Sequence, residues 1–379
     1  MKTATISLAF IILAILCASC SNKKEQEQAE IAINATMPDV AIMAVSAVNN
    51  EALLGKIAIA ASTQEAANAA LKKINKLTTQ QGWLYDAAAN ATHANIRLFA
   101  VEKVDDQAIL THVVTNDTDE AVLTAALPKL TDETLLGAVA KNAKDWRVRA
   151  YAASKVTDQV ALRTLATRDA KPEVRYAATN RLVDQAALST IAKHDAHEEV
   201  RFMALGKVVD QAVIADVARD DRNDNVRALA VDKLTDQSAL ADVVIRDSVE
   251  EIRAKAFQKL SAQAELARVA KDGKNNYSMR AAEKVTDESL AIDIARNTPE
   301  SYIYVVVIAI RNINDQSFLE QMAAKRIEDY ENFMGPSSYS SAREAAINKI
   351  ASRAFLTKLL NRCSSYWVPI IKKRIQQLN

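Results

Sequence analysis

The sequence predicts an all-α protein, an α-α superhelix in which about 12 short helix-turn-helix repeats stack into a right-handed solenoid. The first observation is a motif. The stretch KVTDQ at 155–159 returns in related form every 26 residues, as KVDDQ, KLTDE, RLVDQ, KVVDQ and KLTDQ. The second is composition, because six glycines and six prolines in 379 residues, with abundant alanine, favour helices. The third is a pair of apolar stripes in every repeat.

Residues 184–210 show these stripes clearly. Leu188 and Ile191 lie at helical spacing in a first helix, and Val200 and Leu205 do so in a second. Helices of about ten residues are marginal alone in water, so we expect them to persist only by burying their stripes against neighbouring repeats. A small residue in the second helix lets neighbours approach closely, and it recurs as Ala100, Ala126, Ala152, Ala178, Ala204, Ala230 and Ala256.

Aspartate recurs where each first helix is expected to begin. There it accepts a hydrogen bond from a free backbone N–H and complements the positive end of the helix. The expected caps are Asp106, Asp132, Asp158, Asp184, Asp210, Asp236, Asp287 and Asp315. Ala262 leaves one cap missing, and Asn50 fits the earliest copy, so we expect the array to start near residue 38. The basic residue of each motif is expected to complement the end of its own second helix and to keep its head in water.

A second set of charges recurs in the second helix. The arginines are Arg149, Arg175, Arg201, Arg227 and Arg253, and the aspartates six residues before the last four are Asp169, Asp195, Asp221 and Asp247. This D-x5-R arrangement resembles HEAT repeats, in which an Asp–Arg ladder links successive units. The resemblance extends over about residues 38–379 and implies an armadillo-type solenoid. The repeats are shorter than the roughly 40–47 residues usual in that family.

The N-terminus resembles a bacterial lipoprotein. Lys2 precedes an apolar run over 4–16 that is too short to span a bilayer comfortably, and the stretch CASC ends at Cys20. The resemblance implies a signal peptide over 1–19, lipidation of Cys20 and, from Ser21, an outer-membrane location. The alternatives are an ordinary cleaved signal or a short anchor. The polar, charged residues after Cys20 predict a flexible tether over 20–37.

The remaining segments follow from the regularity of the pattern. We expect the array over 38–325, a loop insertion over 326–341, and terminal repeats with a C-terminal cap over 342–379. Only three cysteines are present, and loss of the signal would leave a lipidated Cys20 and a lone Cys363, so no internal disulfide is expected.

The sequence offers little support for catalysis or cofactors. HDAHEE at 194–199 has two imidazoles that suggest metal binding, but the stretch also fits an inter-helix turn. No H-E-x-x-H, glycine-rich phosphate loop or G-x-S-x-G elbow occurs in the sequence. We therefore expect no enzyme, no cofactor and no metal. The net charge of +1 gives no general attraction for nucleic acid.

Protein or peptide binding is the expected function. Side chains on the second helices that point away from the apolar stripe are candidates, and the aromatic ones fit an interface. The candidate partner-binding residues are Trp146, Tyr151, Tyr176, Asn180, Phe202 and Asp232. The alternative is that the rings pack as core. The sequence thus predicts a monomeric, lipid-anchored scaffold of the bacterial envelope. The other hypotheses are a HEAT-like enzyme of bilin-lyase or glycosylase type and a purely structural spacer.

Overall fold

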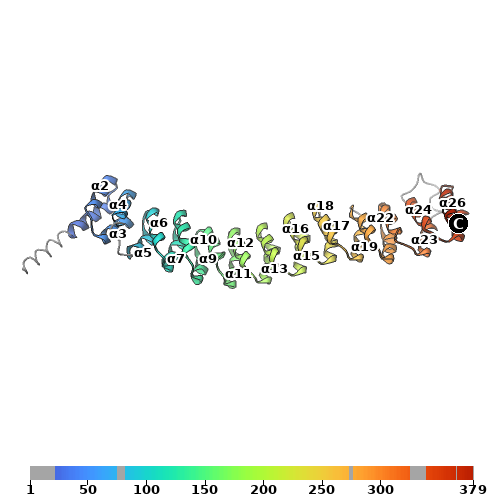
Figure 1. Cartoon of the computed structure of the whole chain (residues 1–379), viewed down its shortest axis with the longest axis horizontal. Helices are drawn as coiled ribbons and strands as arrows, with labels where there is room; N and C mark the ends of the chain where they lie inside the picture. The colour runs from blue at the N-terminus through green and yellow to red at the C-terminus, as the bar shows by residue number, and fades with distance from the viewer. Residues whose placement is uncertain (1–21, 75–81, 273–275, 325–338, 364, 379) are drawn as a thin grey trace, which may run out of the picture. The chain divides into compact units, whose positions relative to one another are not determined.

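The computed structural model describes residues 22–74, 82–272, 276–324, 339–363 and 365–378 (Figure 1). Within these residues every regular element is an α-helix or a short 3-10 turn, and no strand occurs. Helices follow one another in pairs, so the protein is an α-helical repeat protein. The predicted all-α repeat fold is confirmed. None of the described helices is long and apolar enough to cross a membrane.

The chain divides into two compact units, residues 1–187 and 188–379. In the first unit a helix over 22–34 precedes the others. These are α2 (Pro38–Ser46), α3 (Glu51–Ala60), α4 (Gln64–Ile74), α5 (Gly82–Asn90), α6 (Ala94–Lys103), α7 (Gln107–Asn116), α8 (Glu120–Ala126), η1 (Leu127–Lys129), α9 (Glu133–Asn142), α10 (Trp146–Ala153), α11 (Gln159–Arg168) and α12 (Pro172–Arg181). Helices pack on the partner within their pair and on the equivalent helix of the next pair, as α10 does on α9 and α12.

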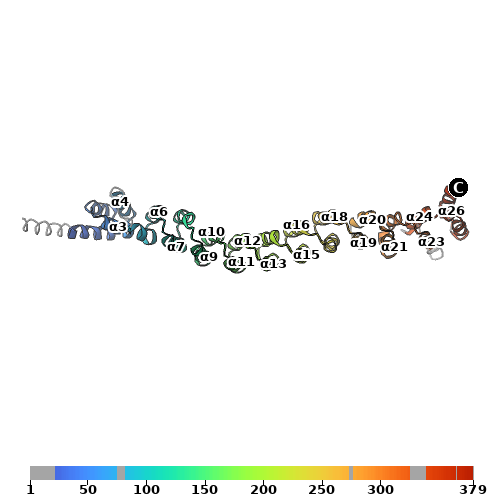
Figure 2. The same cartoon turned by 60° about the horizontal axis from the view of Figure 1, so that its bottom comes forward.

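The second unit continues the same plan, as the two views show (Figures 1 and 2). Helix α13 (Gln185–His194) starts in the last residues of the first unit and lies mostly in the second. It is followed by α14 (Glu198–Lys207), α15 (Gln211–Asp220), α16 (Asp224–Lys233), α17 (Gln237–Arg246), α18 (Glu250–Lys259), α19 (Gln263–Asp272), α20 (Tyr277–Lys284), α21 (Glu288–Asn297), η2 (Glu300–Tyr302), α22 (Ile303–Ile310), α23 (Gln316–Ala324), α24 (Tyr339–Lys349), α25 (Arg353–Leu360) and α26 (Val368–Gln377).

The core of each unit is a row of repeated apolar positions. The alanines expected at close helix contacts are fully buried in every copy, from Ala100 to Ala256. The apolar residue four places later is buried as well, for example Val156 in the first unit and Leu234 in the second. Each short helix therefore gains its hydrophobic contacts from its neighbours rather than from its own length.

The N-terminal boundary differs from the sequence-based expectation. Residues 22–34, assigned to a flexible tether, form a helix in which Ala29 and Ala32 are buried. The Glu25 carboxylate accepts a hydrogen bond from the backbone N–H of Asn50 at 3.1 Å, which is the contact that later first helices make with the next repeat. The helix pairs therefore include residues 22–34 and do not start only near residue 38. The polar composition of the segment concealed the two alanines that it buries.

The other expected boundaries lie partly outside the described residues. The proposed signal peptide over 1–19, Cys20 and most of the insertion over 326–341 belong to that part of the chain. Helix α24 starts at Tyr339, so the last residues of the expected insertion are helical. From Tyr339 onward, α24, α25 and α26 pack together around the buried Ile347, Leu356 and Trp367.

Candidate partner-binding face and the ladder that supports it

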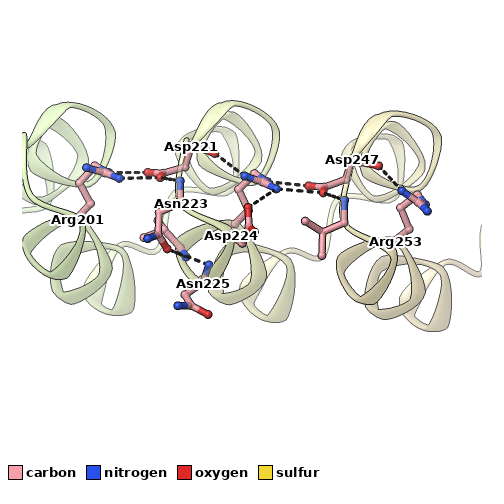
Figure 3. Close-up of polar contacts among 10 residues, drawn as sticks. Arg201, Asp221, Asn223, Asp224, Asn225, Asp247 and Arg253 are labelled. Atoms are coloured by element: carbon pink, nitrogen blue, oxygen red, sulfur yellow. Dashed lines mark hydrogen bonds and ion pairs between the residues drawn. The ribbon is translucent and has the colours of Figure 1, made fainter.

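The Asp–Arg ladder in the second unit joins consecutive helix pairs through buried bidentate bonds (Figure 3). Arg201 donates from Nε to Asp221 Oδ2 at 2.7 Å and from Nη2 to Asp221 Oδ1 at 2.8 Å. Arg227 makes the same pair of bonds with Asp247, at 2.8 and 3.2 Å. Both side chains of the first pair are only 3% exposed. Each partner lies 20 residues further along, in the following repeat.

A third bond of each arginine explains the D-x5-R spacing. Arg227 Nη1 donates to the backbone carbonyl of Asp221, six residues earlier, at 2.9 Å. Asp221 thus accepts from Arg201 through its carboxylate and from Arg227 through its carbonyl. Its Oδ1 also accepts from the N–H of Asn223, which caps α16 by accepting from the N–H of Asn225 (Figure 3). One aspartate therefore fixes the turn of its own repeat and links that repeat to the preceding one.

The first unit contains the ladder as well. Arg149 donates to Asp169 at 2.8 and 3.1 Å, and Arg175 donates to the carbonyl of Asp169 at 3.0 Å. Arg97 and Asp117 form a further pair at 2.6 Å that the sequence analysis missed. Arg97 donates to the backbone carbonyl of Ala91, six residues earlier. Any residue type can supply this acceptor, so the position does not need to be an aspartate. The spacing that identifies the ion pair is arginine followed 20 positions later by aspartate.

At the other end of the ladder, Arg253 has a different set of partners. It donates to the carbonyl of Asp247 at 2.6 Å and pairs with Glu250 on its own helix. Glu250 also accepts from the hydroxyl of Tyr277 at 2.7 Å, and this tyrosine is buried against Phe257. The contact of Tyr277 with Phe257 thus accompanies the bond to Glu250, at the place where the repeat is one residue shorter than elsewhere.

The ladder changes the acidity of its aspartates. Burial by itself would raise the pKa of Asp117, but bonds from Arg97 and from the N–H groups of Asp119 and Thr118 outweigh burial and hold the pKa below its ordinary value. The pKa of Asp169 is lowered in the same way, because Arg149 and the N–H of Lys171 outweigh the effect of burial. These carboxylates are therefore charged in the folded protein at any neutral or mildly acidic pH.

The repeated motif makes three separate contacts, of which the sequence reveals only the aspartate cap. Asp236 accepts from the N–H of Ala239 at 2.8 Å at the start of α17. The next residue, Gln237, accepts through Oε1 from the N–H groups of Ser261 and Ala262 in the following repeat, at 2.8 and 3.1 Å. We call this cross-repeat contact the glutamine clamp. In the first unit Gln107 makes it with Thr131 and Asp132.

The basic residue of the motif reaches backward, contrary to the sequence-based expectation. Lys259 donates to the carbonyls of Val231 and Asp232 in the preceding repeat, at 2.8 and 2.6 Å. Arg181 donates to the carbonyl of Val156 at 2.8 Å in the first unit. These heads do not lie free in water. They satisfy the open carbonyls that end the previous second helix.

The candidate partner-binding residues of the first unit lie on α10 and α12. Trp146 and Tyr151 are half-buried, with the Arg147 guanidinium 5.6 Å from one ring and the Lys155 ammonium 5.6 Å from the other. Tyr176 is 40% exposed on α12, and Asn180 lies one turn later on the exposed side. The tyrosine is therefore not a core residue.

The second unit contains the other candidates, Phe202 and Asp232. Phe202 on α14 is 44% exposed although it is a large apolar side chain. One turn later stands Gly206, and no side chain or distant backbone atom lies within 4 Å of the place where its Cβ would be. Asp232 on α16 forms an exposed ion pair with Lys255 at 2.9 Å. An apolar ring, an open surface and a paired charge thus occur on the second helices of this unit.

The histidine-rich turn lies beside a small open cavity. Among the described residues no group of three or more His, Cys, Asp or Glu side chains gathers in a way that holds a metal ion. His194 instead lines an open cavity of about 270 Å³ together with Lys193, Asp216 and Asp221. Lys193 pairs with Asp216 at 2.9 Å, and Asp221 belongs to the ladder. The carboxylates of Asp216 and Asp221 in this cavity are therefore already paired with basic side chains.

Comparison with known proteins adds no family. No family profile and no curated protein matches the chain. Among solved structures, a crystal structure of importin beta has a TM-score of 0.26 and 11% identity, over 93% of this chain and 60% of that one. The chain thus spans less than two thirds of importin beta. A computationally designed self-assembling cyclic homooligomer has a TM-score of 0.10 and 13% identity, over 97% of this chain and 94% of its own. Neither likeness bears on function at these scores.

Proposed function

We propose that the protein is a lipid-anchored scaffold of the bacterial envelope whose HEAT-like repeats bind a protein or peptide along the second helices. The observation that carries the proposal is the exposure of Tyr176 and Phe202. They occupy the same position of successive repeat motifs, one in each unit, and each leaves about two fifths of its surface in water. Aromatic side chains are favoured anchors in interfaces because they bury a large area for little loss of rotamer freedom.

The scaffold supports such a face by holding its helices at fixed spacing. Within each unit, ladder bonds, glutamine clamps and back-reaching basic residues join neighbouring repeats, so the exposed side chains stand on preorganised helices. Preorganisation reduces the free energy that binding costs. The proposed ligand is an extended peptide or protein surface, because repeat arrays present long surfaces rather than enclosed sites. No reactive centre, cofactor or nucleic acid is part of the proposal, and the protein acts as a monomer.

The anchor rests on the N-terminal sequence. An apolar run followed by small residues and Cys20 fits cleavage before the cysteine and lipidation of its thiol, with an outer-membrane destination. Stable anchoring needs more than one hydrocarbon chain, which a lipoprotein modification supplies at a single residue.

The test is capture from envelopes solubilised in detergent, with mass spectrometry of the N-terminal peptide and of co-purified proteins. The variant Tyr176→Ala/Phe202→Ala is compared with Val160→Ala/Val209→Ala, since those two valines are also exposed apolar residues but lie on a first helix and in a turn. We expect the first variant to lose a specific partner and the second to keep it. Equal capture by both variants would remove the proposed face, and the absence of any stable partner would favour a structural spacer.

A further inference from the structure

The first helix pair exposes an apolar face. In later pairs of the first unit, the residues at the equivalent positions are buried. Ile31 in the helix over 22–34 is 43% exposed. At the same position of the first unit the later residues are buried to 7% or less: Ile57, Val113, Val139 and Leu165. Val40 in α2 is 44% exposed, whereas its equivalents Ile96, Val122, Val148 and Val174 are buried to 1% or less. These are core positions whose preceding neighbour is missing from the described residues.

Three more residues extend this surface. Met37, Val40, Met43 and Ala47 follow one another at helical spacing on one side of α2, and Met43 is 73% exposed. Ala47 occupies the position at which later repeats carry the back-reaching lysine or arginine. We call Ile31, Met37, Val40, Met43 and Ala47 the N-terminal end face. A terminal repeat normally needs a polar outer face, so an apolar one indicates a contact with something apolar.

We propose that the N-terminal end face docks on the surface of the lipid bilayer, beside the lipidated cysteine. This inference rests on the proposed lipidation of Cys20. Only Ser21 separates Cys20 from Asn22, the first described residue of the helix, and each of the two steps along the chain spans at most about 3.6 Å, so the anchor sits within roughly 7 Å of the folded body. The tether expected over 20–37 would have allowed the body to move away from the membrane, but the helix over 22–34 removes that freedom.

The Met43 and Ala47 end of this face lies near the anchored end of the helix pair. Glu25, near the first described residues of this helix, accepts a bond from the N–H of Asn50, so these residues lie next to the turn that follows α2. Met43 lies in the last turn of α2 and Ala47 directly follows the helix, so both are close to the anchored end. Acyl chains that enter the bilayer from Cys20 would bring these side chains to the interface, where an apolar face is buried by about 5–10 Å.

The contact is apolar rather than electrostatic. The exposed charges of this helix pair are nearly balanced, with Lys23 and Lys24 opposed by Glu27, Glu30 and Asp39. Attraction to anionic lipid would need an excess of basic residues. Docking is therefore expected on zwitterionic and anionic membranes alike, with little dependence on salt. Its consequence is a fixed orientation of the first repeat at the membrane.

The experiment places an environment-sensitive fluorophore on the purified lipidated protein in vesicles. The label goes on a cysteine introduced by Met43→Cys in a Cys363→Ser background, because acylation blocks Cys20 and signal removal eliminates Cys17. The matched control is Val160→Cys, an apolar residue of similar exposure on α11. Vesicles of phosphatidylcholine alone and with phosphatidylglycerol are compared, each containing lipid with a spin label near the headgroup. Mass spectrometry of the same sample reports the state of Cys20.

We expect a blue-shifted emission and a quenching ratio at least about twice the control for the Met43 label, in both vesicle types and at high salt. Equal quenching of the two labels on a lipidated protein overturns the docking and leaves the anchor intact. An unmodified Cys20 overturns both proposals. A blue shift without lipid quenching, together with crosslinking between two Met43→Cys chains, would assign the face to a second copy instead. The variant Val40→Ser/Met43→Ser, labelled at Asn22→Cys, should lose the blue shift of that label without losing lipidation.

Discussion

The guanidinium of Arg201 and the carboxylate of Asp221 meet through two nearly parallel hydrogen bonds of 2.8 and 2.7 Å, and neither side chain is more than 3% exposed. Two buried charges in such a geometry compensate each other's loss of hydration. The pair crosses from one repeat to the next, so its role is to fix the distance and angle between neighbouring helix pairs. Arg149 and Asp169 make the same two bonds in the first unit, with side chains that are 15% and 8% exposed.

The first prediction concerns this pair. Arg201→Met leaves Asp221 buried without its partner, and breaking a buried ion pair typically destabilises by about 3–5 kcal/mol. The matched control is Lys193→Met, which breaks the exposed pair with Asp216 and should cost less than about 1 kcal/mol. Urea unfolding compares the midpoints. A long array can unfold in stages, so hydrogen exchange over α14 and α16 locates the loss. Similar midpoints for the two variants would show that the ladder does not stabilise the array.

The second prediction concerns the glutamine clamp. Gln237→Leu removes the acceptor for the N–H groups of Ser261 and Ala262, and we expect a loss of roughly 1 kcal/mol with faster exchange of these two amides. Gln237→Glu keeps the acceptor oxygen and should preserve their protection. Natural copies support this distinction, because Glu133 and Glu288 accept the same kind of bond from the following repeat. Fast exchange in both variants would mean that the side-chain amide of Gln237, not the acceptor, holds the turn.

The regularity of the sequence explains which features could be predicted from it. Helix caps such as Asp236 are local, because the cap and its N–H partner lie three residues apart, and the periodic motif places them correctly. The backward bonds of Lys259 and the forward bonds of Gln237 join residues 24–28 positions apart. Such contacts depend on how one repeat sits on the next, which no local pattern specifies. The ladder lies between these cases, because the sequence shows both residues of a pair but not which aspartate each arginine chooses.

The candidate face was predictable to a lesser degree. Helical periodicity places Tyr176 and Phe202 opposite the buried alanine, and exposure follows from that placement. Periodicity did not reveal the pairing of Asp232 with Lys255, since the two residues belong to different repeats. It also concealed the first helix pair, whose charged residues at 22–30 resemble a linker although Ala29 and Ala32 are buried. Composition averaged over a window hides one or two small core residues.

The third prediction concerns the missing N-terminal cap of α19. Ala262 stands where the other first helices carry a capping oxygen, and α19 starts directly after it. Ala262→Asp should stabilise the second unit by about 1 kcal/mol, since it supplies an acceptor for a free N–H and a negative charge at the positive helix end. Ala262→Val, which adds bulk without an acceptor, serves as the control. Thermal unfolding should show a higher Tm for the aspartate variant only, and an unchanged Tm would mean that another group already satisfies this helix end.

The fourth prediction concerns acid. The folded-state pKa of Asp169 lies below its unfolded value, because hydrogen bonds from Arg149 and from the N–H of Lys171 overcome the opposing effect of burial. A lowered folded pKa means that the unfolded chain takes up a proton first as pH falls. The stability that this carboxylate provides is therefore complete above its unfolded pKa of about 3.9 and is lost as pH falls toward the lower folded value. The same direction holds for Asp117 beside Arg97.

Asp169→Asn tests this assignment, because asparagine keeps an acceptor for the N–H of Lys171 but cannot titrate. We expect this variant to be less stable than the parent at pH 7 and to lose less stability between about pH 5 and pH 2. The control is Asp132→Asn, which replaces a cap by another good cap outside the ladder and leaves the pair of Arg149 and Asp169 intact. Urea midpoints measured across this range give the slope for each protein. A parental slope in Asp169→Asn would assign the acid sensitivity to other carboxylates, while the stability difference at neutral pH would still report the broken pair.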